Sequence, residues 1–180
     1  MKKIIIIILF FVFYPSFGQT ENLSKIVLND ILKNTYSYSK PLITNKLDST
    51  SVEYHLKRLI ENKKGYFVSN KNSIDKIKLT KTEQKSIITD IRKQYSSEWK
   101  KEDFENFEII NDQESLEYLK QNNKNTLVTI SKPIFLRNDE IAFVFFANYC
   151  CLEYGRTELA FYKKQNGIWK VWICISSGDF

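Results

Sequence analysis

The sequence predicts an α+β fold in which N-terminal helices pack on a C-terminal antiparallel β-meander, all within a single domain. In the first 125 residues, apolar side chains recur at helical spacing, as Val52, Leu56 and Leu59 do. After residue 126, β-branched and aromatic runs alternate with turn residues, and Asn166-Gly167 is typical of a tight β-hairpin. We therefore expect the helices to come first and the sheet last.

Three consecutive antiparallel strands are expected in the meander, over residues 141–147, 159–162 and 169–175. The first is apolar on both alternating faces, which indicates a strand covered on both sides or lying mid-sheet under a helix. The hairpin sets a register that pairs Gln165 with Ile168, Lys163 with Lys170, Phe161 with Trp172 and Leu159 with Cys174. A curved sheet of this kind would resemble a cystatin-like or NTF2-like arrangement in architecture, which does not fix a function.

Three main helices are predicted before the meander. Leu23, Val27 and Ile31 give helical spacing over about residues 22–34. Two capping boxes, each a threonine followed three residues later by a glutamate, start the other two helices at Thr50 and Thr80. We expect the helix over residues 81–95 to cover one face of the sheet. Residues 36–47 are interpreted as a connection.

The N-terminus has the pattern of a secretory signal peptide. A basic start at Lys2 and Lys3 precedes a ten-residue apolar run over residues 4–13, and Ser16 and Gly18 are small residues at −3 and −1 of a cut before Gln19. The apolar run is shorter than the about 20 residues that a membrane-spanning helix needs. We therefore expect residues 1–18 to be removed on export to the periplasm or the medium, leaving residues 19–180 as one domain without a transmembrane segment.

The charge pattern argues against nucleic-acid binding. The formal net charge of +6 falls to +4 when Lys2 and Lys3 are lost, and only four of the 27 basic residues are arginine. These basic residues are scattered among carboxylates, whereas nucleic-acid readers favour arginine and a concentrated basic face. A composition rich in lysine, isoleucine and asparagine explains the excess of positive charge without a nucleic-acid partner.

Catalytic and metal-binding patterns are weak. His55 is the only histidine, and it is interpreted as a half-exposed helix residue beside an apolar stripe. A serine hydrolase triad would have to use it, but no glycine-flanked serine accompanies it. The cysteines show no zinc-ligand spacing, and phosphate-loop and dinucleotide fingerprints are absent from the sequence. We predict no cofactor, no metal and no assigned catalytic residue.

The three cysteines, Cys150, Cys151 and Cys174, would meet an oxidising compartment after export. In a simple meander Cys150 and Cys174 lie two strands apart, at about 9–10 Å. A disulfide needs Cα atoms within about 7 Å. We therefore predict no bridge between Cys150 and Cys174.

Several unusual residues gather between the first two meander strands. Tyr149, Glu153, Tyr154 and Arg156 are predicted to form part of a recognition surface, with Gly155 allowing the backbone to turn. The alternative is a plain connection in which the tyrosines pack on the sheet and Arg156 pairs locally with Glu153 or Glu158.

The meander also carries a family resemblance. Ser131-Lys132-Pro133-Ile134-Phe135, Asn148-Tyr149-Cys150 and Gly167-Ile168-Trp169-Lys170 are similar to the tail of a family of small uncharacterised exported proteins of Gram-negative bacteria. The resemblance covers about the last 55 residues and implies export but no activity. In that family the Tyr-Cys pair is often followed by glycines and a second cysteine, whereas Cys151 and Leu152 stand here.

The function predicted from the sequence is that of an exported, non-enzymatic binding or accessory module that takes a protein or a small ligand, as an inhibitor or immunity protein does. The alternative is a small periplasmic hydrolase that uses paired carboxylates, because Asp and Glu residues are plentiful. A cleft with two close, buried carboxylates would favour the hydrolase.

Overall fold

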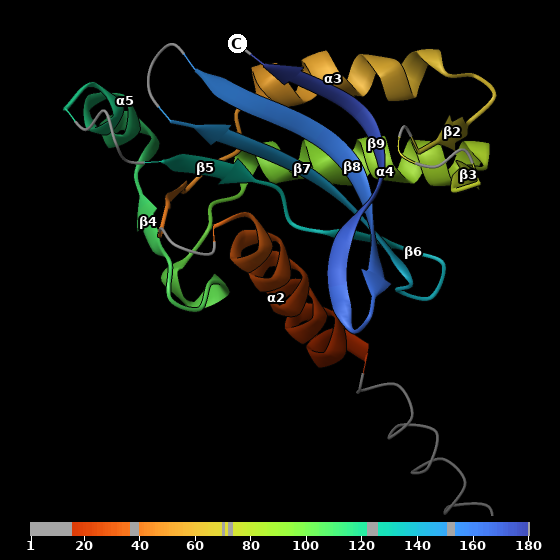
Figure 1. Ribbon diagram of the computed structural model, residues 1–180, viewed down its shortest axis with the longest axis horizontal. Coiled ribbons are helices and arrows are strands. Elements are labelled where there is room, and N and C mark those ends of the chain that lie inside the picture. The colour runs from red at the N-terminus through yellow and green to blue at the C-terminus, as the bar shows by residue number, and fades with distance from the viewer. Residues whose placement is uncertain are drawn as a thin grey trace, which may run out of the picture.

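The computed structural model describes residues 16–36, 40–69, 71, 74–121, 126–150 and 154–179. The elements run in the order α2 (Ser16–Thr35), β1 (Leu42–Thr44), α3 (Ser49–Glu61), β2 (Tyr66–Val68), β3 (Lys76–Lys78), α4 (Lys81–Lys93), η1 (Gln94–Ser96), η2 (Lys101–Asp103), β4 (Glu108–Ile110), α5 (Asp112–Gln121), β5 (Leu127–Ile130), β6 (Ile134–Leu136), β7 (Ile141–Tyr149), β8 (Gly155–Gln165) and β9 (Ile168–Asp179). Figure 1 shows how they are arranged around one large sheet. The predicted α+β class is confirmed.

The main sheet has seven strands in the order β4-β1-β5-β7-β8-β9, with β6 paired to β7 beside this path. The meander β7-β8-β9 is antiparallel, as predicted. β1 pairs in parallel with both β4 and β5, so the sheet is mixed. The interpretation of residues 36–47 as a connection was wrong here, because three of them form this inner strand.

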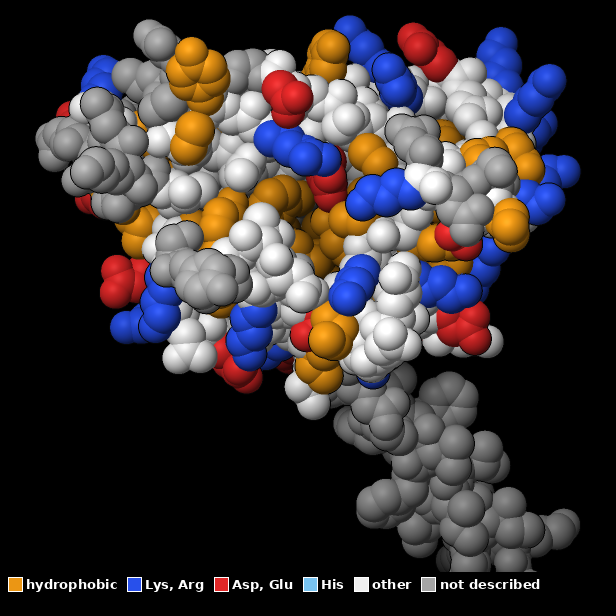
Figure 2. Space-filling model, in the orientation of Figure 1, with side chains coloured by type: hydrophobic (Ala, Val, Ile, Leu, Met, Phe, Trp, Pro, Cys, Tyr) orange, Lys and Arg blue, Asp and Glu red, His pale blue; other side chains and the backbone are white. Residues whose placement is uncertain are grey.

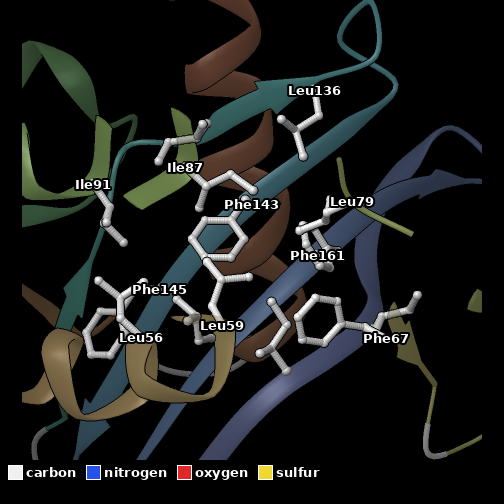
Figure 3. Close-up of a cluster of buried hydrophobic side chains, with 14 of the residues drawn as sticks. Leu56, Leu59, Phe67, Leu79, Ile87, Ile91, Leu136, Phe143, Phe145 and Phe161 are labelled. Carbon is white, nitrogen blue, oxygen red and sulfur yellow. The ribbon is translucent and has the colours of Figure 1, made fainter. Parts of the chain in front are cut away.

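Helices cover both faces of the sheet. On one face α3 and α4 pack against phenylalanines of β7 and β8, and Figure 3 shows Leu56, Ile87 and Ile91 approaching Phe143 and Phe145. On the other face α2 packs against alternate residues of β5, β7 and β8. The expected cover by the 81–95 helix is confirmed, and so is the prediction that the apolar 141–147 strand is covered on both sides.

The tip of the β8–β9 hairpin has the predicted register, with Gln165 opposite Ile168 and Lys163 opposite Lys170. Farther from the turn, the register slips at two bulges, so that Phe161 lies opposite Ile173 and Leu159 opposite Ser176. The predicted partners Trp172 and Cys174 were therefore wrong. A bulge places two residues of one strand against one of its partner, which no hydrophobic pattern announces.

One of the two predicted capping boxes is confirmed. At α4 the Thr80 hydroxyl accepts from the Glu83 amide at 3.1 Å, and the Glu83 carboxylate accepts from the Thr80 amide at 2.7 Å. The Thr50 box was wrong, because α3 starts earlier and Asp48 caps it by accepting from the Thr50 amide at 2.9 Å.

Among the described residues, no helix combines the length and the apolar character that crossing a membrane would require. The expected cleavage point before Gln19 falls near the start of α2, while residues 1–15 lie outside the described part of the chain.

Candidate functional site

His55 is buried rather than half-exposed, so its sequence interpretation was wrong. Its side chain is 1% exposed and lies between α3 and the last two strands. Nδ1 is 2.8 Å from the Ser176 hydroxyl and Nε2 is 2.6 Å from the Thr157 hydroxyl. All three residues are buried, so this cluster fixes α3 to β8 and β9 and is closed to a substrate.

The strongest candidate site is a pocket on the opposite face of the sheet. It lies between the C-terminal half of α2 and strands β7, β8 and β9, and it has a volume of about 380 Å³. We call it the α2 pocket and define it by its polar residues Asn148, Arg156, Glu158 and Lys170 and by its apolar walls. Figure 2 shows a hollow in this region, with hydrophobic side chains on its floor and basic side chains at its rim.

Two side chains of α2 hold the helix against the hairpin and thereby shape the pocket. The Asp30 carboxylate accepts from the backbone amide of Trp169 at 2.9 Å, and the Asn34 amide donates to the backbone carbonyl of Trp169 at 3.4 Å. Trp169 itself is buried and lines the pocket. These two hydrogen bonds to the Trp169 backbone therefore fix the wall that Trp169 forms.

Strand β8 supplies the charged centre of the pocket. Side chains alternate along a strand, so Arg156, Glu158 and Tyr162 share the face toward α2. Glu158 is 8% exposed, and its Oε1 accepts from the Tyr162 hydroxyl at 3.0 Å. Its Oε2 lies 3.4 Å from Nη2 of Arg156, whose side chain is 62% exposed. The carboxylate is thus deep and the guanidinium is at the mouth.

Burial raises the pKa of Tyr162 well above its ordinary value, and the neighbouring Glu158 charge adds to this shift. The Tyr162 hydroxyl therefore stays protonated and serves as a donor to Glu158. Burial also raises the pKa of the Cys174 thiol, with Glu158 as the second cause. The shift favours the protonated thiol over the nucleophilic thiolate.

The structure places Tyr149 and Arg156, two of the residues predicted to form a recognition surface, on opposite faces of the sheet. Arg156 lines the α2 pocket, whereas Tyr149 points to the other face, where it packs against the cluster under α3. Burial is the main cause that raises the pKa of Tyr149. The charge of Asp48, at the start of α3, adds to this shift. Tyr154 is 65% exposed, and Glu153 lies outside the described residues.

The sequence reasoning missed Glu158, Tyr162 and Trp169 as site residues. A strand drawn back to Gly155 would have placed Arg156, Glu158 and Tyr162 on one face. Instead Arg156 was placed between the first two meander strands, although β8 begins at Gly155 and Arg156 pairs with Asn148. The backbone amide of Arg156 also donates to Oδ1 of Asn148 at 3.2 Å.

A second pocket of about 280 Å³ lies at the N-terminal half of α2. It contains two carboxylates, Glu21 and Asp103, and two lysines, Lys25 and Lys132. Asp103 already accepts from the Lys100 amide at 2.8 Å, and the Lys132 ammonium lies 5.1 Å from the centroid of the Trp99 ring. These charged groups are therefore partly committed to local structure.

Within the described ranges, no group of three or more histidine, cysteine or acidic residues is placed to hold a metal ion. Cys150 and Cys174 are not joined by a disulfide, and the strand order that places them two strands apart is confirmed. No protein-family model, curated protein or solved structure matches this chain. The cystatin-like or NTF2-like architecture stays a prediction.

Proposed function

We propose that the protein is an exported, non-enzymatic binding module whose ligand site is the α2 pocket. The observation that carries the proposal is the pairing of a buried Glu158 carboxylate with an exposed Arg156 guanidinium inside one pocket with apolar walls. Small-molecule sites in proteins are typically concave, largely apolar and supplied with a few convergent polar groups, with volumes of roughly 300–1,000 Å³. The pocket meets this description.

A binding role suits the pocket better than the hydrolase alternative. General acid–base hydrolysis with carboxylates requires two of them facing one substrate. Among the described residues that line the α2 pocket, Glu158 is the single carboxylate. It is also engaged by Tyr162 and Arg156, so it acts as a fixed charge that orders the pocket.

Export is the second part of the proposal. It rests on the basic and apolar N-terminal pattern and on the small residues before Gln19. N-terminal sequencing of the protein recovered from the envelope or the medium tests it. A mature chain beginning at Gln19 is expected, and retention of residues 1–18 in a membrane pellet would overturn it.

The pocket can be tested by filling it. Val171 lines the pocket and is 40% exposed, while Ile168 on the same strand is also 40% exposed but does not line it. We expect a neutral aromatic probe, 2-naphthol, to shift the backbone amide resonances of Trp169 and Glu158 saturably. Val171→Trp should abolish these shifts, whereas the matched Ile168→Trp should preserve them. No saturable shift in the parent protein, or equal binding by both variants, would reject the pocket as the ligand site.

A further inference from the structure

We infer that the preferred ligand of the α2 pocket is a small monocarboxylic acid with an apolar body, bound through the Arg156 guanidinium. This inference rests on the proposed function, because it names the ligand class of the same site. The unused donors of Arg156, the balance of charge in the pocket lining and the chemistry of the walls support it.

Arg156 is held in place but has donors to spare. Its backbone belongs to the β8 ladder, and its amide is fixed by Asn148. Among the described residues, its guanidinium makes one long contact, at 3.4 Å, to Glu158. A guanidinium carries five N–H donors in a planar fork that matches the two oxygens of a carboxylate. The fork at the mouth is therefore available to an anionic group.

The charge around the pocket favours an anion over a cation. Lys170 also lines the pocket and is exposed, so two positive side chains stand against the single Glu158 carboxylate in the described lining. Glu158 is already satisfied by the Tyr162 hydroxyl and neutralised by Arg156. A ligand ammonium would have to compete with Arg156 for Glu158, whereas a ligand carboxylate can accept from the remaining donors of Arg156 and lies near the exposed Lys170.

The walls define the rest of the ligand and its orientation. Phe146 and Trp169 are 7% and 2% exposed, and Ile31 and Val171 complete an apolar lining. A phenyl ring or a branched alkyl group fits such walls, while the buried Glu158 charge would repel a second carboxylate placed deep in the pocket. The body therefore enters first, and the carboxylate remains at the mouth beside Arg156.

Three probes of nearly equal shape separate the charge preference from the apolar contribution. They are 4-phenylbutyrate, the neutral 4-phenylbutanamide and the cationic 4-phenylbutylamine, titrated calorimetrically into the mature chain at pH 7.4 and low salt. We expect the acid to bind at least about tenfold more tightly than the amide, and the amine most weakly. A bidentate charge-assisted hydrogen bond is of this size, and the exposure of Arg156 places the expected gain at the low end.

Variants assign the preference to the guanidinium. Arg156→Ala should bring the affinity for the acid down to that for the amide and leave the amide unchanged. Arg156→Lys keeps the charge without the planar fork and should retain part of the preference. Arg58→Ala, an exposed arginine on α3 and therefore across the sheet, is the matched control for the lost charge and should change nothing. Thermal unfolding of each variant verifies that it folds.

The results can overturn the ligand class without touching the proposed function. Equal affinities for acid and amide, a preference for the amine, or an acid preference that survives Arg156→Ala would each reject the carboxylate assignment. Failure of all three probes while 2-naphthol still binds would also reject it, with the pocket intact as a site. Loss of 2-naphthol binding as well would remove the proposed function itself.

Discussion

Nδ1 of His55 lies 2.8 Å from the hydroxyl oxygen of Ser176, although 121 residues separate them in the chain. The second ring nitrogen meets the Thr157 hydroxyl at 2.6 Å, and the Phe145 ring centroid is 6.0 Å from the imidazole. The imidazole thus joins α3 to β8 and β9 inside the apolar layer that the helices form with the sheet. Buried polar groups of this kind are costly to leave without partners.

We expect His55→Ala to lower the free energy of unfolding by roughly 2–4 kcal/mol, since it leaves a cavity and two buried hydroxyls that lose a partner. Equilibrium urea unfolding measures the loss. Lys57→Ala, an exposed neighbour on the same helix, serves as the control and should stay within about 0.5 kcal/mol of the parent. A loss no larger than that of the control would show that the cluster does not fix α3.

The same histidine should give the protein a pH-dependent stability. Burial lowers the pKa of His55 below its ordinary value of 6.5, and the charge of Arg58 adds to the effect. In the unfolded chain the imidazole regains its ordinary pKa, so near and below pH 6.5 the unfolded state binds more protons than the folded state. Stability must therefore fall as the pH falls from about 7.5 toward the folded pKa of His55, and this contribution then becomes constant.

Melting temperatures measured between about pH 5.5 and 8 check this window, which lies above the ordinary range of carboxylates. His55 is the only histidine in the sequence, so the slope has a single candidate source among imidazoles. His55→Gln should flatten the profile over this range. A melting temperature that rises on acidification, or a slope that persists in His55→Gln, would contradict the assignment.

The β8–β9 hairpin shows how far the sequence could predict this fold. Asn166 and Gly167 both have positive φ, at 52° and 84°, as a tight two-residue turn requires. The register next to the turn follows from that local chemistry. It fails beyond Tyr162 because Trp172 and Ile173 both pack against the cluster under α3 and α4, which forces a bulge that depends on tertiary contacts.

The candidate site was only partly predictable, for a related reason. Arg156 was singled out by its residue type, but the polar run that contains it has weak strand propensity and was not recognised as the start of β8. Its pocket partner Trp169 comes from β9, and the opposite wall comes from α2. His55 likewise reaches its hydroxyl partners only through the packing of α3 on the sheet. No pattern within a single segment contains such information.

Helix α3 allows the observed and the predicted cap to be compared directly. Asp48 accepts hydrogen bonds from the Thr50 amide and the Ser51 hydroxyl, while Thr50 lies in the exposed first turn. Asp48→Ala should therefore lower the free energy of unfolding by about 1 kcal/mol, the usual loss for an N-cap. Thr50→Ala should be neutral or slightly stabilising, since only helix propensity changes and alanine is the better helix former. Urea midpoints of the two variants decide, and equal losses would restore the Thr50 capping box.

Two glycines with positive φ should respond very differently to alanine. Gly65 (φ 62°) follows α3 and precedes β2, and a Cβ added there would lie 2.4 Å from the Leu79 carbonyl oxygen. Gly167 (φ 84°) sits in the hairpin turn, where an added Cβ meets nothing within 4 Å. Gly167→Ala should therefore cost about 1–2 kcal/mol through backbone strain alone. Gly65→Ala carries the same strain and must also displace Leu79, whose amide donates to the Gly65 carbonyl at 2.7 Å. It should unfold at a clearly lower urea concentration than Gly167→Ala, and equal midpoints would mean that the β2–β3 hairpin can move away from Gly65 at no cost.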